Sequence, residues 1–138
     1  MILNNKKLKI LYFLFIVCII LHLFSFIRCT FLKFGINIDF LSYNKQNNLI
    51  LNGWATSHFI LYLIVGYLYP NEYLYVFSLG IIWEIYEYLF AKDKIFISNI
   101  YKFLCGEKDG IMQMVYNKYD PLINLVGYII GNFLSKRN

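Results

Sequence analysis

Long stretches without a charged side chain constrain the fold of this chain more than any other feature. Residues 10–27 contain no Asp, Glu, Lys or Arg over eighteen positions, and residues 46–71 contain none either. An apolar run of about 18 or more residues can cross the hydrocarbon core of a bilayer as a helix. Of the 138 residues, 59% are hydrophobic and 15% charged, which is too apolar for an ordinary soluble domain. We therefore expect an integral, multi-pass membrane protein whose first partner is the lipid bilayer.

Four charge-poor runs predict four membrane-spanning helices in one domain that covers residues 1–138. The expected helices lie over residues 8–27, 51–69, 73–91 and 120–134. Pro70 and Asn71 predict a tight turn between the second and third helices. The last run is short, at about 22 Å against a hydrocarbon core of about 30 Å. That helix therefore either packs inside the bundle or extends upstream through residues 111–119.

Two long connections, residues 28–48 and 92–118, separate the helices and mix apolar residues with lysines. This pattern predicts short helices at the membrane interface. The expected fold class is thus all-α: an integral membrane four-helix bundle with short interfacial helices. A signal peptide is the competing interpretation of the first run. Its apolar region is usually about 7–15 residues long and precedes a small-residue cleavage site, and this run shows neither property.

Basic residues lie beside the apolar runs, although the net charge of +5 first suggests a nucleic-acid partner. Lys6, Lys7 and Lys9 precede the first helix, and Lys136 and Arg137 follow the last. Such flanks face anionic head groups, so we expect no nucleic-acid partner. The orientation stays open, because the lysines before the first helix and the basic residues of the long connections favour opposite answers. Three cysteines without a Cys-x-x-Cys pair predict neither a disulfide framework nor a zinc site.

Five polar residues form the candidate site: His58, Glu84, Glu87, Asp120 and Asn124. The histidine lies near the start of the second predicted helix and the two glutamates near the end of the third. The aspartate and asparagine lie at the start of the fourth. If successive helices alternate in direction, all five meet at the membrane face of the long connections. Ionisable side chains inside a membrane are costly and mark functional sites.

Helical phase also brings these residues together. Three stripes contain them: Trp54, His58 and Tyr62; Gly80, Glu84 and Glu87; and Asp120, Asn124, Gly127 and Gly131. Residues at these spacings share one face of a helix, so the stripes predict polar groups directed into the bundle.

Each polar residue also has a simpler interpretation. The glutamates can extend to the interface from a helix end, and His58 can be a structural histidine of the bundle. The two glycines of the last helix match a common helix-packing motif. Asp120 before Pro121 is typical of a helix start, with the carboxylate as N-cap and proline at the first helical position. His22, inside the first helix, is best explained as a polar residue that faces a neighbouring helix.

The chain resembles a family through these motifs. The last helix is similar to the signature helix of the VanZ-like family of small bacterial membrane proteins, through Asp120, Asn124, Gly127 and Gly131. Two further family helices, one with His-x3-Tyr and one with paired acidic or amide residues, are matched by His58 and Tyr62 and by Glu84 and Glu87. The resemblance covers residues 54–131, and the third helix also resembles that of YjdF-like inner-membrane proteins. It implies a small polytopic membrane protein without a defined activity.

The candidate site suits an amphipathic ligand, such as a lipid head group or a lipid-linked substrate. Glu84 or Glu87 would act as a base, His58 as acid, base or partner, and Asp120 as an orienting charge. A metal-binding version would use these four residues and would suit Mn, Fe or Mg better than zinc. No His-Glu-x-x-His motif supports it, so we predict no metal and no cofactor.

Other function classes stay open at this point. A non-catalytic membrane scaffold or partner subunit would use the polar cluster to lock the bundle. A component of a proton-coupled transporter would use it to relay protons. Whether the protein is an enzyme, and whether it forms a homo-oligomer, is not determined by the sequence.

Overall fold

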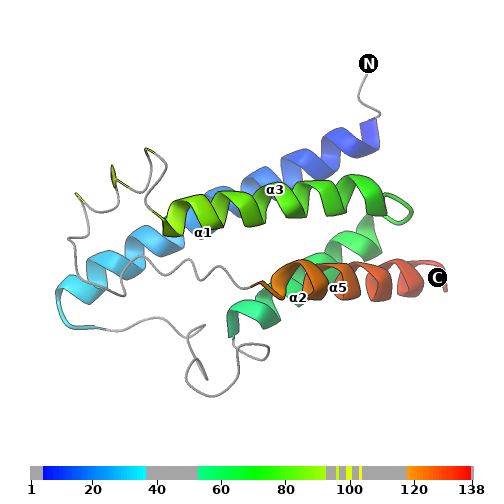
Figure 1. The fold of residues 1–138 in the computed structure, drawn as a ribbon. Helices are drawn as coiled ribbons and strands as arrows, with labels where there is room; N and C mark the ends of the chain where they lie inside the picture. Colours follow the sequence, from blue (N-terminus) through cyan, green and yellow to red (C-terminus); the bar gives the residue numbers. More distant parts are fainter. Residues whose placement is uncertain are drawn as a thin grey trace.

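The computed structural model describes residues 5–36, 53–92, 96, 99–100, 103 and 118–137. Within these ranges the chain forms four long helices and no strand (Figure 1): α1 (Asn5–Lys33), α2 (Gly53–Leu68), α3 (Tyr73–Ala91) and α5 (Asp120–Ser135). The prediction of an all-α fold is therefore confirmed. Helix α3 has the predicted bounds, and α2 and α5 differ from theirs by one or two residues.

Helix α1 is longer than predicted at both ends. Residues 28–33 were expected to begin a loop, and that expectation is wrong, because they continue the helix. No glycine or proline interrupts the helix before Gly35, which has the left-handed φ of 77°. The Ile36 N–H donates to the Phe31 carbonyl at 3.1 Å. A left-handed glycine with such a bond forms a Schellman-type end, so the helix stops where glycine first permits it.

The helices alternate in direction, as the turn at Pro70 and Asn71 predicted. Asn71 has a positive φ of 67°, which an asparagine in a tight turn adopts at little cost. Its N–H donates to Asn132 Oδ1 near the end of α5 at 3.2 Å, and the Lys6 amine near the start of α1 donates to the Pro70 carbonyl. The start of α1, the α2–α3 turn and the end of α5 thus form one end of the bundle, called the turn end. The opposite end, where α2 and α5 begin, is called the loop end.

The predicted stripes are the buried faces of their helices. Five buried positions follow one face of α2: Ala55, His58, Tyr62, Val65 and Gly66. Five follow α3: Val76, Gly80, Glu84, Glu87 and Phe90. Five more follow α5: Asp120, Asn124, Gly127, Tyr128 and Gly131. The helical spacing therefore directs polar groups inward, as predicted.

Glycines bring α2 and α5 into backbone contact. A Cβ atom at Gly127 would come within 2.5 Å of the Phe59 carbonyl oxygen, and one at Gly131 would overlap the Leu63 carbonyl. A Cβ atom at Gly66 of α2 would likewise meet the Tyr128 carbonyl. The helix-packing interpretation of the last helix is confirmed, because only a residue without a side chain fits at these positions.

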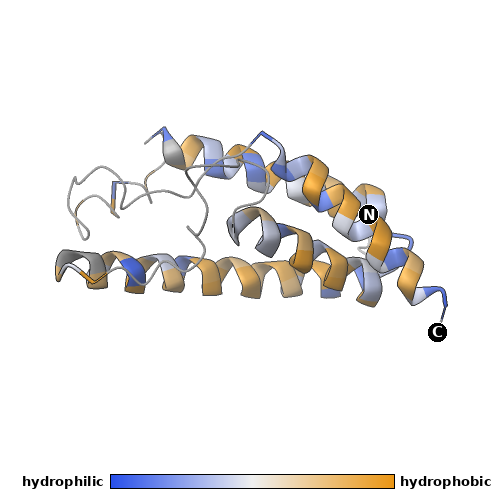
Figure 2. Cartoon of the chain, turned by 90° about the horizontal axis from the view of Figure 1, so that it is seen from below, coloured by the Kyte–Doolittle hydropathy of each residue, from blue (hydrophilic) through white to orange (hydrophobic). Residues whose placement is uncertain are grey.

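The outward faces of the helices are strongly apolar (Figure 2). Large hydrophobic side chains are exposed on all four long helices, among them Phe15 on α1, Ile60 on α2, Ile82 on α3 and Leu122 on α5. Within the described residues, α1 is the helix long and apolar enough to cross a membrane by length and composition, and α2 is apolar but shorter.

Two further expectations concern the loop end. Cys29, fully buried near the end of α1, is disulfide-bonded, and its partner lies outside the described residues. The expectation that the cysteines form no disulfide is therefore wrong for Cys29. The predicted interfacial helices fall mostly outside the described residues. Of the described positions in the second connection, four are helical, namely Phe96, Asn99, Ile100 and Phe103.

Candidate functional site

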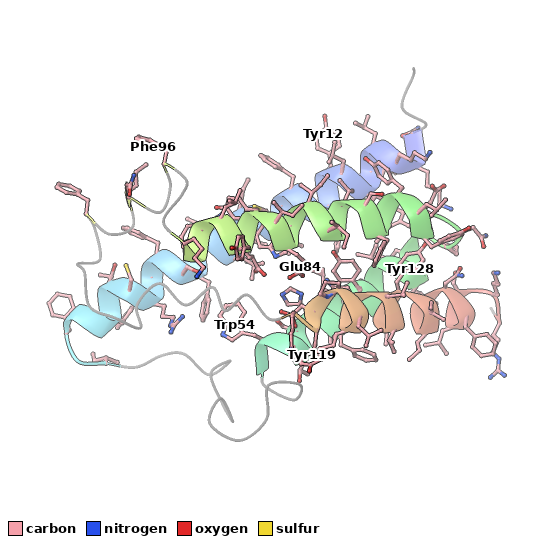
Figure 3. All side chains as sticks on the ribbon, viewed as in Figure 1. Tyr12, Trp54, Glu84, Phe96, Tyr119 and Tyr128 are labelled. Atoms are coloured by element: carbon pink, nitrogen blue, oxygen red, sulfur yellow. The ribbon has the colours of Figure 1, made fainter. Side chains whose placement is uncertain are left out.

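The five predicted site residues meet at the loop end. His58, Glu84, Glu87, Asp120 and Asn124 are 9%, 4%, 6%, 2% and 2% exposed. They come from three helices, and Figure 3 shows Glu84 between α3 and the pair formed by α2 and α5. The convergence follows from the alternating directions of the helices together with the phase of each buried stripe.

Asn124 links His58 to Glu84. The Asn124 Nδ2 group donates to Glu84 Oε1 at 3.3 Å, and Asn124 Oδ1 lies 3.1 Å from His58 Nδ1. Because an ionised carboxylate only accepts hydrogen bonds, the asparagine amide must face it with the NH2 group and must face the histidine with its oxygen. His58 Nδ1 is then the donor, and Nε2 keeps a lone pair. His58 Nδ1 also lies 3.8 Å from Glu84 Oε1.

Glu87 and Asp120 lie near the same imidazole. One ligand-type atom from each of His58, Glu87 and Asp120 falls within 4.8 Å of the other two. The Oε2 atoms of Glu84 and Glu87 are buried and accept no hydrogen bond within the described residues. A buried polar atom without a partner costs roughly 1–3 kcal/mol, more if it is charged. The site therefore holds open acceptor positions that packing alone does not explain.

The structure corrects one expectation about Asp120. Helix α5 has Tyr119 as its N-cap, and the N–H groups of Leu122 and Ile123 both donate to the Tyr119 carbonyl at 3.0 Å. The prediction that Asp120 is the N-cap residue is therefore wrong by one position, because Asp120 is the first residue of the helix. A carboxylate in the first turn still interacts favourably with the helix dipole.

The site lies close to the ends of its helices. Asp120 begins α5, His58 is the sixth residue of α2, and Glu87 lies four residues before the end of α3. At about 1.5 Å per residue, these three groups are within about 8 Å of a helix end. If these helices cross a bilayer, this depth is closer to the head groups than to the midplane.

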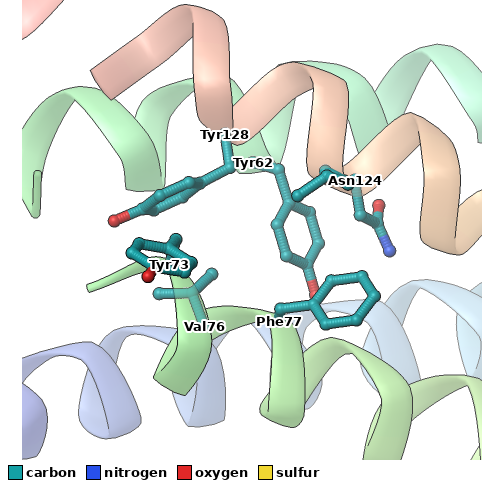
Figure 4. Close-up of a pocket in the computed structure, with 7 residues that line it drawn as sticks. Tyr62, Tyr73, Val76, Phe77, Asn124 and Tyr128 are labelled. Atoms are coloured by element: carbon teal, nitrogen blue, oxygen red, sulfur yellow. The ribbon is translucent and has the colours of Figure 1, made fainter. Parts of the chain in front are cut away.

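A small hollow adjoins the site on the side of the turn end (Figure 4). Its wall is mainly aromatic: Tyr62, Tyr73, Val76, Phe77, Asn124, Leu125 and Tyr128. Asn124 thus separates the polar cluster from an apolar hollow. The Tyr62 hydroxyl packs against Gly80, where a Cβ atom would come within 2.7 Å of it.

Two other polar residues of α1 behave differently. His22 Nε2 lies 2.9 Å from the Tyr86 hydroxyl, so His22 faces a neighbouring helix as predicted and does not belong to the cluster. Arg28 is only 7% exposed at the loop end and is not one of the predicted site residues. The predicted first helix ends at residue 27, whereas α1 continues to Lys33, so Arg28 lies inside the helix and not in a loop.

Comparisons with known proteins found no match among family models, curated proteins or solved structures. The similarity to the VanZ-like family therefore stays a prediction based on the spacing of a few residues.

Proposed function

We propose that the protein is a multi-pass membrane protein whose loop-end site binds the polar group of an amphipathic molecule, a lipid head group or a lipid-linked glycan. The observation that carries this proposal is a bundle with polar groups inside and apolar side chains outside. Five ionisable side chains lie in the interior at the loop end, namely Arg28, His58, Glu84, Glu87 and Asp120, while large hydrophobic residues cover the exterior of every long helix.

This distribution is the reverse of that in a soluble protein. Soluble proteins rarely expose apolar patches larger than a few hundred Å². Here exposed side chains such as Leu74, Ile85, Ile129 and Phe133 extend the apolar exterior to α3 and α5, beyond the first helix. Lipid tails satisfy such an exterior, which supports membrane burial of the whole bundle rather than of α1 alone.

The depth and chemistry of the site suggest the ligand class. Site residues within about two helical turns of the helix ends suit a group that stays near the water interface. Carboxylates accept hydrogen bonds, so the open oxygens of Glu84 and Glu87 favour a ligand that donates them. Sugar hydroxyls and ammonium groups do so, whereas a bare phosphate would meet like charge.

Two reporter fusions test the multi-pass part of the proposal. Green fluorescent protein and alkaline phosphatase report cytoplasmic and external positions, respectively, when fused after Ile36 or at the C-terminus. Four spans place these two points on opposite sides of the membrane, whichever way the protein is oriented. A single span through α1 places both on the same side, and that result would overturn the multi-pass proposal.

Orientation can be predicted from Cys29. Structural disulfides persist in oxidising compartments, so its bond favours an external loop end. Lys6 and Lys7 then lie at the cytoplasmic side, where basic flanks are enriched. We expect the fusion after Ile36 to show phosphatase activity and the C-terminal fusion to fluoresce.

Native mass spectrometry in detergent tests ligand binding with three probes: a diglucosyl diacylglycerol, phosphatidylethanolamine and phosphatidylglycerol. We expect the first or second to bind in preference to the third, and the double variant Glu84→Gln, Glu87→Gln to lose that preference. Glu72→Gln, at the turn end, is the matched control and should bind like the wild type. Equal binding of all three lipids, or unchanged binding by the double variant, would contradict the proposal.

A further inference from the structure

We propose that the loop-end site binds one divalent metal ion of the Mn²⁺ and Fe²⁺ class, with His58, Glu87 and Asp120 as its protein ligands. This inference deepens the proposed function, because it concerns the same site and adds a cofactor to it. It replaces the expectation, drawn from the missing His-Glu-x-x-His motif, that no metal binds.

The ligand geometry supports a shared ion. One donor atom of each of the three residues lies within 4.8 Å of the other two. Three donors about 2.0–2.4 Å from one ion lie about 3–4 Å apart, so side-chain rotations that bring these atoms closer together would complete the shell. The residues come from α2, α3 and α5, whose packing fixes their relative positions.

An open carboxylate oxygen is the second observation that points to a ligand. Glu87 is 6% exposed, and its Oε2 atom has no hydrogen-bond partner within the described residues, although its carboxyl faces His58 and Asp120. Glu84 Oε2 is open in the same way. A cation among these groups would satisfy the oxygens and neutralise negative charge where solvent cannot.

His58 is held in the form that binds metals. Its Nδ1 atom faces Asn124 Oδ1, and the hydrogen bond from Asn124 to Glu84 fixes the direction of the amide. Nε2 therefore keeps the lone pair that a metal requires. Metal-binding histidines commonly donate their other N–H to such an outer partner, which sets the ring orientation. Asn124 and Glu84 would therefore act as positioning residues for His58.

The donor set selects the class of metal. Carboxylates suit Mg²⁺, Ca²⁺ and Mn²⁺, whereas imidazole suits Fe²⁺, Zn²⁺ and other transition metals. One imidazole with two carboxylates falls where these preferences overlap, at Mn²⁺ and Fe²⁺. Three protein ligands leave coordination positions for oxygen atoms, and a hydroxyl group of the bound head group would supply one.

Electron paramagnetic resonance of free Mn²⁺ tests the proposal on the full chain in detergent after EDTA treatment and desalting. We expect the wild type to bind one Mn²⁺ per chain, and Glu87→Gln and Asp120→Asn each to weaken binding more than tenfold. Asn124→Ala should weaken it by about 10–100-fold, as loss of an outer partner does. Glu72→Gln is the matched acidic control and should bind Mn²⁺ like the wild type.

The thermal stability of the wild type is an independent readout that needs no site variant. A ligand of the folded state raises its melting temperature, so Mn²⁺ should do so, and equal Mg²⁺ should do so less. A wild type that binds no stoichiometric Mn²⁺, or a Glu87→Gln variant that binds it equally, would overturn the metal proposal. If glycolipid binding then persists in EDTA, the proposed function stands without the metal. If Mn²⁺ binds and no lipid does, the proposed function fails and the metal site stands.

Discussion

The two ends of the bundle both contain buried or half-buried polar groups, but they satisfy them differently. At the turn end, the Tyr128 hydroxyl donates to the Tyr69 carbonyl and accepts from the Glu72 N–H, both at 2.8 Å. The Glu72 carboxylate also lies 3.9 Å from the Lys6 amine. The hydroxyl and the carboxylate each have a partner of matching chemistry, so the turn end is explained by structure alone.

The loop end has more buried polar side chains, and several of their atoms have no hydrogen-bond partner among the described residues. Glu84 and Glu87 keep buried oxygens without hydrogen bonds among the described residues. Buried polar groups in native proteins are nearly always paired, so exceptions require an explanation. Local conflicts between sequence and stability concentrate at functional sites. The contrast shows that incomplete satisfaction, rather than polarity itself, separates the candidate site from ordinary helix packing.

The largest loss of stability is expected when the contact between α2 and α5 is disrupted. Gly131→Leu would force a side chain into the Leu63 carbonyl and separate α2 from α5. Overpacking typically costs about 1–3 kcal/mol, and the rigid backbone on both sides puts this change at about 3 kcal/mol or more. We expect little folded protein by size-exclusion chromatography in detergent. Ile130→Leu, on the outward face of the same helix, should fold normally; equal folding of both variants would refute the packing described here.

The next largest loss of stability is expected at the turn end, where the polar groups have partners. Tyr128→Phe removes the hydroxyl that pairs with the Tyr69 carbonyl and the Glu72 N–H. Leaving such backbone groups unpaired should lower the free energy of unfolding by about 1–3 kcal/mol. Thermal melting in detergent measures the loss. Tyr12→Phe, at an exposed position of α1, is the matched control, and the proposed difference between the ends fails if Tyr128→Phe melts no lower than it.

Much of this arrangement was predictable from sequence, because it depends on periodicity. The turn at Pro70, the bounds of α3 and the buried faces of α2, α3 and α5 follow from local residue patterns. The meeting of His58 with Glu84 also follows, since both lie twelve or thirteen residues from the same turn and face inward. Helical phase and chain direction therefore carry most of the information about the candidate site.

Other features depend on atoms that periodicity does not determine. The partner of His58 Nδ1 is Asn124, and the chain of hydrogen bonds from His58 through Asn124 to Glu84 depends on side-chain rotamers. The N-cap at Tyr119 and the burial of Arg28 depend on where two helices end, which sequence patterns locate only to within a few residues. The disulfide at Cys29 depends on a contact distant in sequence. These features required coordinates.

At the loop end, unlike the turn end, removal of a polar group should stabilise the protein. Glu87→Gln preserves the shape of a site residue and removes its charge, so without bound metal it should raise the free energy of unfolding by about 0.5–2 kcal/mol. Burial of charge opposes folding, and neutralisation relieves that cost. Melting after EDTA treatment measures the gain, and added Mn²⁺ should reverse the order of wild type and variant. A variant less stable than the wild type in EDTA would mean that Glu87 is structural.

The smallest effect is expected for the ion pair of the turn end. Lys6 and Glu72 are 36% and 17% exposed in their side chains, so water and salt screen their attraction. Such pairs contribute about 0–1 kcal/mol, and Glu72→Gln, which leaves the bond from Lys6 to the Pro70 carbonyl in place, should lower the free energy of unfolding by no more than that. The loss should shrink further in high salt, because screening already removes most of the attraction. If Glu72→Gln instead costs several kcal/mol and the cost is independent of salt, the Glu72 charge is as demanding as those at the loop end. The turn end would then no longer serve as the satisfied reference for the candidate site, and the open oxygens of Glu84 and Glu87 alone would have to support it.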